Sequence, residues 1–162
     1  MNRAKSGIGR VWERKFLGFR LNREKQIGVA PESVERFKTK VRELWRGNQS
    51  RTSQQLRDAW KRYMQGWWGY FGHAEDRTAV FRLEGWIRRH IRKCFWLRWH
   101  DGVGRENALR RLGVGARLRE AARSSRGAWR MAANGAVQKG LSNAVLRRYG
   151  FLLPSDLAGQ ST

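Results

Sequence analysis

Apolar residues recur every three or four positions through the middle of this chain, and this spacing predicts helices because it places them on one helical face. A first helix is expected after Pro31, which suits an early helical position, and should end before Gly47. Ser53 is a suitable N-cap for a second helix, and a third is expected from Ala79 to Trp99. The predicted core stripes are Val34, Phe37, Val41, Leu44 and Trp45 in the first helix, Leu56, Trp60, Tyr63, Met64, Trp67, Tyr70 and Phe71 in the second, and Leu83, Trp86, Ile87, Ile91, Cys94, Phe95 and Leu97 in the third.

Shorter elements are expected on both sides of these helices. The segments KFLGFRL and NREKQIGV, separated by polar residues, predict a short β-hairpin near the N-terminus. Two short helices are predicted at Glu106–Leu112 and Ala116–Arg123 after a DGVG turn, and a last one near Ala136–Tyr149. The segment SSRGAWRMA between them is expected to be a loop anchored by Trp129.

The predicted fold class is mostly α, a compact bundle of about five to six helices with a short N-terminal β-hairpin or extended arm. The expected organisation is an N-terminal arm at residues 1–30, a helical domain at residues 31–152 and a disordered tail at residues 153–162. Gly66 and Gly69 are expected to be packing contacts, since glycine within a helix costs stability unless another backbone comes close.

The charge of the chain points to a polyanionic partner. It carries 35 Lys and Arg residues against 13 Asp and Glu residues, a formal net charge of +22. Nucleic acid is the commonest such partner, because neutralising phosphates releases counterions. An ordinary solvated surface would intersperse acidic residues among the basic ones, and a membrane surface is the weaker alternative because no basic amphipathic helix stands apart from the fold.

Most basic residues of the predicted helices fall outside the apolar stripes, so a folded domain would display them. In the third helix, basic residues surround Trp96 opposite the core stripe, a pattern that looped RNA uses for phosphate pairing and base stacking. The alternative is that Trp96 packs against a neighbouring element, since tryptophan is more often buried. The candidate RNA-binding residues are Lys38, Lys40, Arg42, Arg46, Arg57, Lys61, Arg82, Arg88, Arg89, Arg92, Lys93, Trp96, Arg126 and Arg130.

The sequence offers little for catalysis or metal binding. Its four aspartates are unpaired and there is no Tyr-x-Asp-Asp, so a two-metal polymerase or nuclease centre has no evident ligands. The single cysteine, Cys94, excludes a disulfide framework and a cysteine-cluster zinc site, and no histidine has metal-ligand spacing. His90 lies at helical spacing between Trp86 and Cys94, which favours a core or core-edge position. We expect no autonomous enzyme, no metal and no cofactor.

Six segments occur in one order: KFLGFRL, IGVAPESVERFKTKVREL, MQGWWGYF, FRLEGWIRRHIRKCFWLRW, LRRLGV and SSRGAWRMAANGAVQKGLSNAVLRRYG. The most specific pieces are G-W-x-x-Y-F at 66–71, the run from W-I-R-R to W-x-x-W at 86–99, and R-G-x-W-R at 126–130. Together, from Lys15 to Phe151, they resemble the end of the palm and the following maturase-specific domain (domain X, the thumb) of bacterial group II intron reverse transcriptases.

In that family the domain acts as the polymerase thumb and as an RNA-binding surface. It helps the intron RNA fold into its self-splicing form, and the RNA supplies the catalytic site. The resemblance implies an RNA-binding domain that assists group II intron folding and splicing. The family's fingers and palm are missing, which implies a fragment or stand-alone remnant of an intron-encoded protein. His90 stands where another basic residue is expected, so the charge there should depend on pH.

Two other functions stay open. The chain could be a detached thumb that completes a reverse transcriptase in trans, with KFLGFRL docking on a palm and fingers chain. The alternative partner is a second copy of the chain, which would give a homodimer. It could also be a generic basic nucleic-acid-binding protein, because a tight Gly113–Gly115 turn superficially resembles a helix-turn-helix, although that motif needs a longer second helix. The sequence shows no signal peptide and no apolar stretch that could span a bilayer, so the expected location is the cytoplasm.

Overall fold

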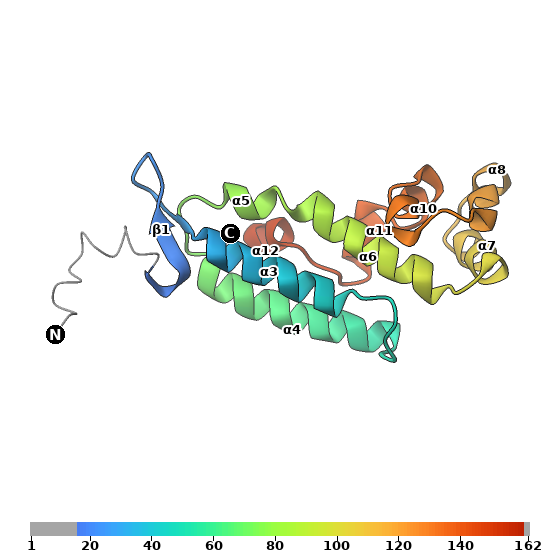
Figure 1. Ribbon diagram of the computed structural model, residues 1–162, viewed down its shortest axis with the longest axis horizontal. Helices are drawn as coiled ribbons and strands as arrows, with labels where there is room; N and C mark the ends of the chain where they lie inside the picture. Colours follow the sequence, from blue (N-terminus) through green and yellow to red (C-terminus); the bar gives the residue numbers. More distant parts are fainter. Residues whose placement is uncertain (1–15, 161–162) are drawn as a thin grey trace.

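The computed structural model describes residues 16–160, which form an elongated and mostly helical molecule with a small hairpin at one end (Figure 1). The first 15 residues of the predicted arm and the last two residues of the predicted tail lie outside this range. The helices are α3 (Pro31–Leu44), α4 (Ser53–Phe71), α5 (Thr78–Phe81), α6 (Glu84–Arg98), α7 (Gly102–Arg111), α8 (Ala116–Arg119), the 3-10 turn η2 (Glu120–Arg123), α9 (Ala128–Met131), α10 (Gly135–Gly140), α11 (Asn143–Arg148) and α12 (Pro154–Gln160).

The predicted β-hairpin is present. A 3-10 turn, η1 (Phe16–Gly18), leads into β1 (Phe19–Leu21), which pairs antiparallel with β2 (Ile27–Val29). A hairpin this short needs support, and the loop before α5 gives it: the Ile27 amide donates to the Glu75 carboxylate at 2.8 Å. The register pairs Phe19 with Val29, Arg20 with Gly28 and Leu21 with Ile27.

Helices α3, α4 and α6 form the body of the molecule and run along its long axis (Figure 1). Their facing sides carry most of the predicted apolar stripes. The prediction is wrong for Tyr70 and Leu97, which are 43% and 42% exposed. Helix α4 begins at a capping box, because the Thr52 hydroxyl accepts from the Gln55 amide at 3.1 Å and the Gln55 side chain accepts from the Thr52 amide at 2.9 Å. The N-cap is therefore Thr52, one residue before the predicted Ser53. The core includes Phe37, Val41, Leu44, Trp45, Leu56, Trp60, Met64, Ile87, Ile91 and Cys94.

The C-terminal segment completes this core. The prediction of a disordered tail from residue 153 is wrong for the described part, since α12 packs against α4 and α5 and buries Leu157. The Asp156 carboxylate caps the start of α12 by accepting from the Leu153 amide at 2.9 Å. The Ser155 amide and hydroxyl donate to the buried Glu84 carboxylate at 2.6 and 2.7 Å. These hydrogen bonds, together with the apolar contacts, hold α12 against the core although the polar sequence of this segment favoured a disordered tail.

Helices α7 to α11 gather at the end opposite the hairpin (Figure 1). They enclose two small clusters, one around Leu109 and Val114, the other around Trp96, Met131 and Val137. The DGVG segment is not a turn here, because the Asp101 carboxylate accepts from the Gly104 amide at 2.8 Å and starts α7.

Two predicted helices are each broken into separate helices, and the helix predicted at Ala116–Arg123 consists of α8 followed by the 3-10 turn η2. The third breaks between α5 and α6, where the Leu83 amide donates to the Val80 carbonyl three residues back, the tighter 3-10 pattern. The last breaks between α10 and α11, because the Ser142 hydroxyl accepts from the Val145 amide at 3.2 Å and caps a new helix. The loop predicted around Trp129 contains one helical turn, α9.

The expected packing role of two α4 glycines is also wrong. Gly66 and Gly69 lie on the exposed face of α4, and a Cβ added at either would meet no atom of the described residues within 4 Å. The absence of a side chain at these two positions therefore does not serve the close packing of another backbone segment. Among residues 16–160, no helix is long and apolar enough to cross a membrane.

Candidate nucleic-acid interface

One side of Trp86 on α6 is covered by cations from α3. Lys38 Nζ lies 5.6 Å and Arg42 Cζ 5.2 Å from the centroid of the Trp86 ring. The two basic residues are four positions apart on α3, so they project from the same face one turn apart. Cations at these distances are attracted to the electron-rich face of an indole ring, which holds both side chains over the α3–α6 junction.

The aromatic contacts continue from Trp86 across α6 to α9. The His90 ring lies 4.4 Å from Trp86 and 4.6 Å from Trp129, measured between ring centroids. Trp129 is 37% exposed, and the Arg89 guanidinium lies 4.2 Å from its ring centroid. Arg89 Nε also donates to the Trp129 carbonyl at 2.9 Å, which fixes α9 against α6.

We call this surface the cation–aromatic ridge. It joins three helices that are far apart in sequence. Lys38, Arg42 and Arg89 lie over indole rings, and Lys38 also lies 3.5 Å from Glu35 on the same helix. Basic side chains beside partly exposed aromatic rings suit an unpaired or looped nucleic acid strand. The ridge consists of Lys38, Arg42, Trp86, Arg89, His90, Lys93 and Trp129.

His90 is neutral at the centre of this ridge. Burial, and after it the nearby charges of Lys93, Arg42 and Arg89, together lower the pKa of its imidazole to about 4. Its Nδ1 is buried without a hydrogen-bond partner among the described residues. The predicted core-edge position of His90 is confirmed, but the expected pH-dependent charge near neutrality is wrong, because two tryptophans and three cations exclude a proton there.

Two of the candidate RNA-binding residues are buried. Trp96 is 1% exposed, packed with Met131 and Val137 beneath Arg105, whose Cζ lies 4.5 Å from the indole centroid. Of the two alternatives for Trp96, packing against a neighbouring element is confirmed, and the stacking of a base on its ring is wrong. Arg92 is 7% exposed, and burial lowers its pKa. It donates to the Leu141 carbonyl at 2.8 Å and to Asn143 Oδ1 at 2.9 Å.

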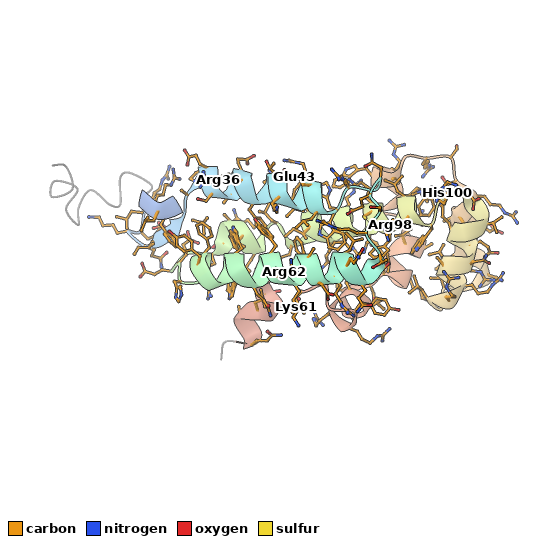
Figure 2. The ribbon with its side chains drawn as sticks, turned by 90° about the horizontal axis from the view of Figure 1, so that it is seen from below. Arg36, Glu43, Lys61, Arg62, Arg98 and His100 are labelled. Atoms are coloured by element: carbon orange, nitrogen blue, oxygen red, sulfur yellow. The ribbon has the colours of Figure 1, made fainter. Side chains whose placement is uncertain are left out.

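The remaining candidate RNA-binding residues do not all lie at the ridge. Arg88 is half-buried and 3.5 Å from Glu84 on the same helix, whereas Arg82, Arg126 and Arg130 are exposed. Lys40 and Arg46 line a hollow of about 380 Å³ together with Arg51, which the sequence did not single out; Glu43 also faces it. Arg57 and Lys61 lie on α4, and Figure 2 shows Lys61 on the side of α4 away from α3. The structure therefore brings only part of the predicted set together.

Several carboxylates are engaged in structural contacts. The Glu106 carboxylate accepts from Arg119 at 2.6 Å and from Arg110 at 3.2 Å, and the hydrogen bond from Arg119 lowers its pKa. Asp156 accepts from Arg147 at 2.8 Å. Within residues 16–160 no group of three or more His, Cys, Asp or Glu side chains is placed to hold a metal ion.

Comparison with known proteins gives one match. Residues 34–113, from the first turn of α3 to just beyond α7, match the family model described as "Group II intron, maturase-specific domain". The matched region contains the α3 and α6 parts of the ridge, whereas Trp129 lies outside it. A search of curated proteins found no match.

Proposed function

Because residues 34–113 form a group II intron maturase-specific domain, we propose that this chain binds a group II intron RNA and assists its folding and splicing. The observation that carries the proposal is the cation–aromatic ridge, whose α3 and α6 residues lie within the matched region. In this proposal the RNA supplies the reacting groups and the catalytic centre. The protein holds RNA segments in the arrangement that splicing requires.

Phosphate contact is the role we assign to the exposed and half-buried basic residues. Such contacts position an RNA without reading its sequence, which fits a surface of charges and rings with few amides or carboxylates. We assign it to Lys38, Arg42, Arg89 and Lys93 on the ridge, to Arg126 and Arg130 beside Trp129, and to Lys40, Arg46, Arg57, Lys61 and Arg82 elsewhere. The buried side chains of Arg92 and Trp96 have no part in it.

We propose that the functional domain extends beyond the matched residues. Phe151, Leu153 and Leu157 belong to the same core cluster as Phe37 and Trp45. A domain that ended near residue 113 would lack these three C-terminal core residues. We therefore place the functional domain from residue 31 to the end of α12.

Salt dependence tests the binding. In filter binding of the full chain to a group II intron transcript, affinity should fall on the order of 10³–10⁵ between about 50 and 200 mM salt if 6–10 phosphates are contacted. The double variant Lys38→Gln/Arg42→Gln should lower the slope of log K against log salt by about 1 for each lost contact. A flat salt response of the wild type would refute RNA binding.

A matched control removes the same charge from the hairpin turn. Arg23 and Lys25 are exposed there, so Arg23→Gln/Lys25→Gln tests whether the position of the charge matters. If both double variants weaken binding equally, the ridge is not the contact surface. The splicing role is measured separately, as the rate of precursor splicing with and without protein. Binding without faster splicing would leave only an RNA-binding function.

A second function, completion of a reverse transcriptase in trans, is favoured by the exposed N-terminal hairpin. Leu17 is largely exposed, and among residues 16–160 strand β1 pairs only with β2. A palm and fingers chain, or a second copy, could add to this edge. Co-purification with a polymerase chain would support this function, and a monodisperse monomer without such a partner would count against it. Generic DNA binding through a helix-turn-helix is disfavoured, because α8 (Ala116–Arg119) is only four residues long.

A further inference from the structure

A small pocket lies away from the ridge, where the start of α4, the second half of α6 and the end of α11 meet. Its volume is about 260 Å³, and it is lined by Ser53, Gln54, Arg57, Phe95, Tyr149 and Phe151. This is below the roughly 300–1,000 Å³ of sites for drug-sized ligands, so it suits a small planar group. Aromatic rings and one guanidinium dominate its lining.

The turn after α11 arranges the rings of this pocket. Gly150 has φ +91°, the left-handed conformation that ends a helix, and the Phe151 amide donates to the Leu146 carbonyl at 3.0 Å. The chain therefore reverses between Tyr149 and Phe151. Tyr149 stays 45% exposed at the mouth, while Phe151 turns inward, with its ring 5.6 Å from Phe95 and 5.3 Å from Trp45.

The same turn positions the pocket's guanidinium. A Cβ at Gly150 would lie 2.9 Å from Cδ and 3.2 Å from Cγ of Arg57, so the arginine stem lies directly on the glycine. Arg57 Nε is 3.4 Å from Asp58, an exposed contact that solvent weakens. The Arg57 side chain is thereby held at the wall of the pocket that Tyr149 also lines.

Further cations lie beside the pocket. Arg148 Cζ is 5.8 Å from the Tyr149 ring centroid, and Arg98 donates to the Arg51 carbonyl at 2.6 Å; Figure 2 shows Arg98 beside the start of α4. Arg51 lines the basic hollow at the end of α3, and Ser53 lines the aromatic pocket. Two residues of chain span at most about 7 Å, so the two depressions are neighbours.

We propose that the aromatic pocket binds one unpaired nucleobase of an RNA strand, stacked on Tyr149, with the flanking phosphates held by Arg57, Arg148 and the basic hollow. The proposal rests on the RNA binding proposed above and adds a second site to it. An apolar side chain of a protein partner would also fit such a pocket, but the surrounding arginines favour a polyanionic strand. Base stacking on aromatic side chains together with backbone-tracking cations is the common mode of single-strand binding.

The test uses the full chain and a single-stranded oligouridylate of about 10 nucleotides, within the usual range of single-strand sites, carrying one central 2-aminopurine. Stacking quenches the fluorescence of this base. The wild type and Tyr149→Phe should quench it, because both keep the ring. Tyr149→Ala should not quench it and should bind on the order of 10-fold more weakly, with an unchanged salt slope because no charge is lost.

Tyr70→Ala is the matched control, since Tyr70 is 43% exposed but lies at the hairpin end of α4, 5.3 Å from the Phe19 ring, whereas the pocket lies at the start of α4. This variant should quench and bind as the wild type does. A blunt RNA duplex of the same charge should bind wild type and Tyr149→Ala equally, because its bases are paired. Equal quenching by wild type and Tyr149→Ala, or none by the wild type, would overturn the pocket proposal. The pocket proposal can fail in this way while the wild type still binds the intron transcript with steep salt dependence. That result would leave the proposed function intact, so the two failures are distinguishable.

Discussion

Lowering the pH from about 7 to about 5 should destabilise this fold through one residue, His90. Its pKa falls from 6.5 to about 4 in the folded protein. At pH values between these two, His90 binds a proton in the unfolded chain but not in the folded one. For a group whose folded pKa is depressed, the stability is fully present above the unfolded pKa of about 6.5 and is lost as the pH falls toward the folded pKa. The cause is burial between Trp86 and Trp129 beside three cations.

The size of the effect follows from linkage. With pKa values of 6.5 and about 4, the free energy of unfolding should fall by about 2 kcal/mol between pH 7 and pH 5. Urea unfolding followed by circular dichroism at several pH values measures it. Carboxylates whose pKa is lowered in the folded state, such as Asp76 and Glu106, lose their contribution below their unfolded values near pH 4. The window above pH 5 therefore isolates histidine.

Two variants separate His90 from the rest of the protein. His90→Gln should show little pH dependence in this window, whatever its stability at pH 7, because it has no proton to gain. His73→Gln should retain the full dependence, since His73 is exposed. A wild-type stability that stays constant from pH 7 to pH 5, or an equal slope in His90→Gln, would refute the assignment of a buried neutral imidazole.

Three further substitutions probe the packing, each measured by urea unfolding. Trp96→Ala should cost about 3–5 kcal/mol, as removal of a buried large aromatic does; a loss below about 1 kcal/mol would mean that the ring is not buried. Arg92→Ala should cost about 1–3 kcal/mol by leaving the buried Leu141 carbonyl unsatisfied, and a neutral result would contradict that hydrogen bond. Gly66→Ala should stabilise the protein by roughly 0.5–1 kcal/mol, because Gly66 is exposed within α4 and only conformational entropy changes; destabilisation would reveal a close contact.

The long helices were predictable because local signals and the apolar repeat agree. Pro31 does begin α3, and the stripe from Phe37 to Trp45 is buried as its spacing predicts. The divisions between α5 and α6 and between α10 and α11 were missed. One signal for the second was present, since Ser142 is a good N-cap, but the break between α5 and α6 depends on a 3-10 turn at Leu83 that carries no proline or glycine.

The candidate site was only partly predictable, because α6 is covered on two sides. Its first apolar stripe belongs to the core cluster that α3 and α4 also form, and α9 and α10 cover much of the side that the sequence pattern predicted to face solvent. That second cover buries Trp96 and converts Arg92 from a surface cation into a donor to Leu141, which lies 49 positions away. It also brings Trp129 to His90. Periodicity within one helix contains no information on which distant segment will cover its other face.

The burial of Trp45 and Trp60 by the end of the chain has a consequence for biosynthesis. Trp60 Nε1 donates to the carbonyl of Leu152, 92 positions later, and Phe151 meets the Trp45 ring edge-on. A nascent chain therefore exposes two indoles on finished helices until residues 151–153 leave the ribosome. Contacts this distant in sequence form late and slow the folding of a domain. A chain terminated before residue 151 would lack this cover over both indoles, although every long helix had been made.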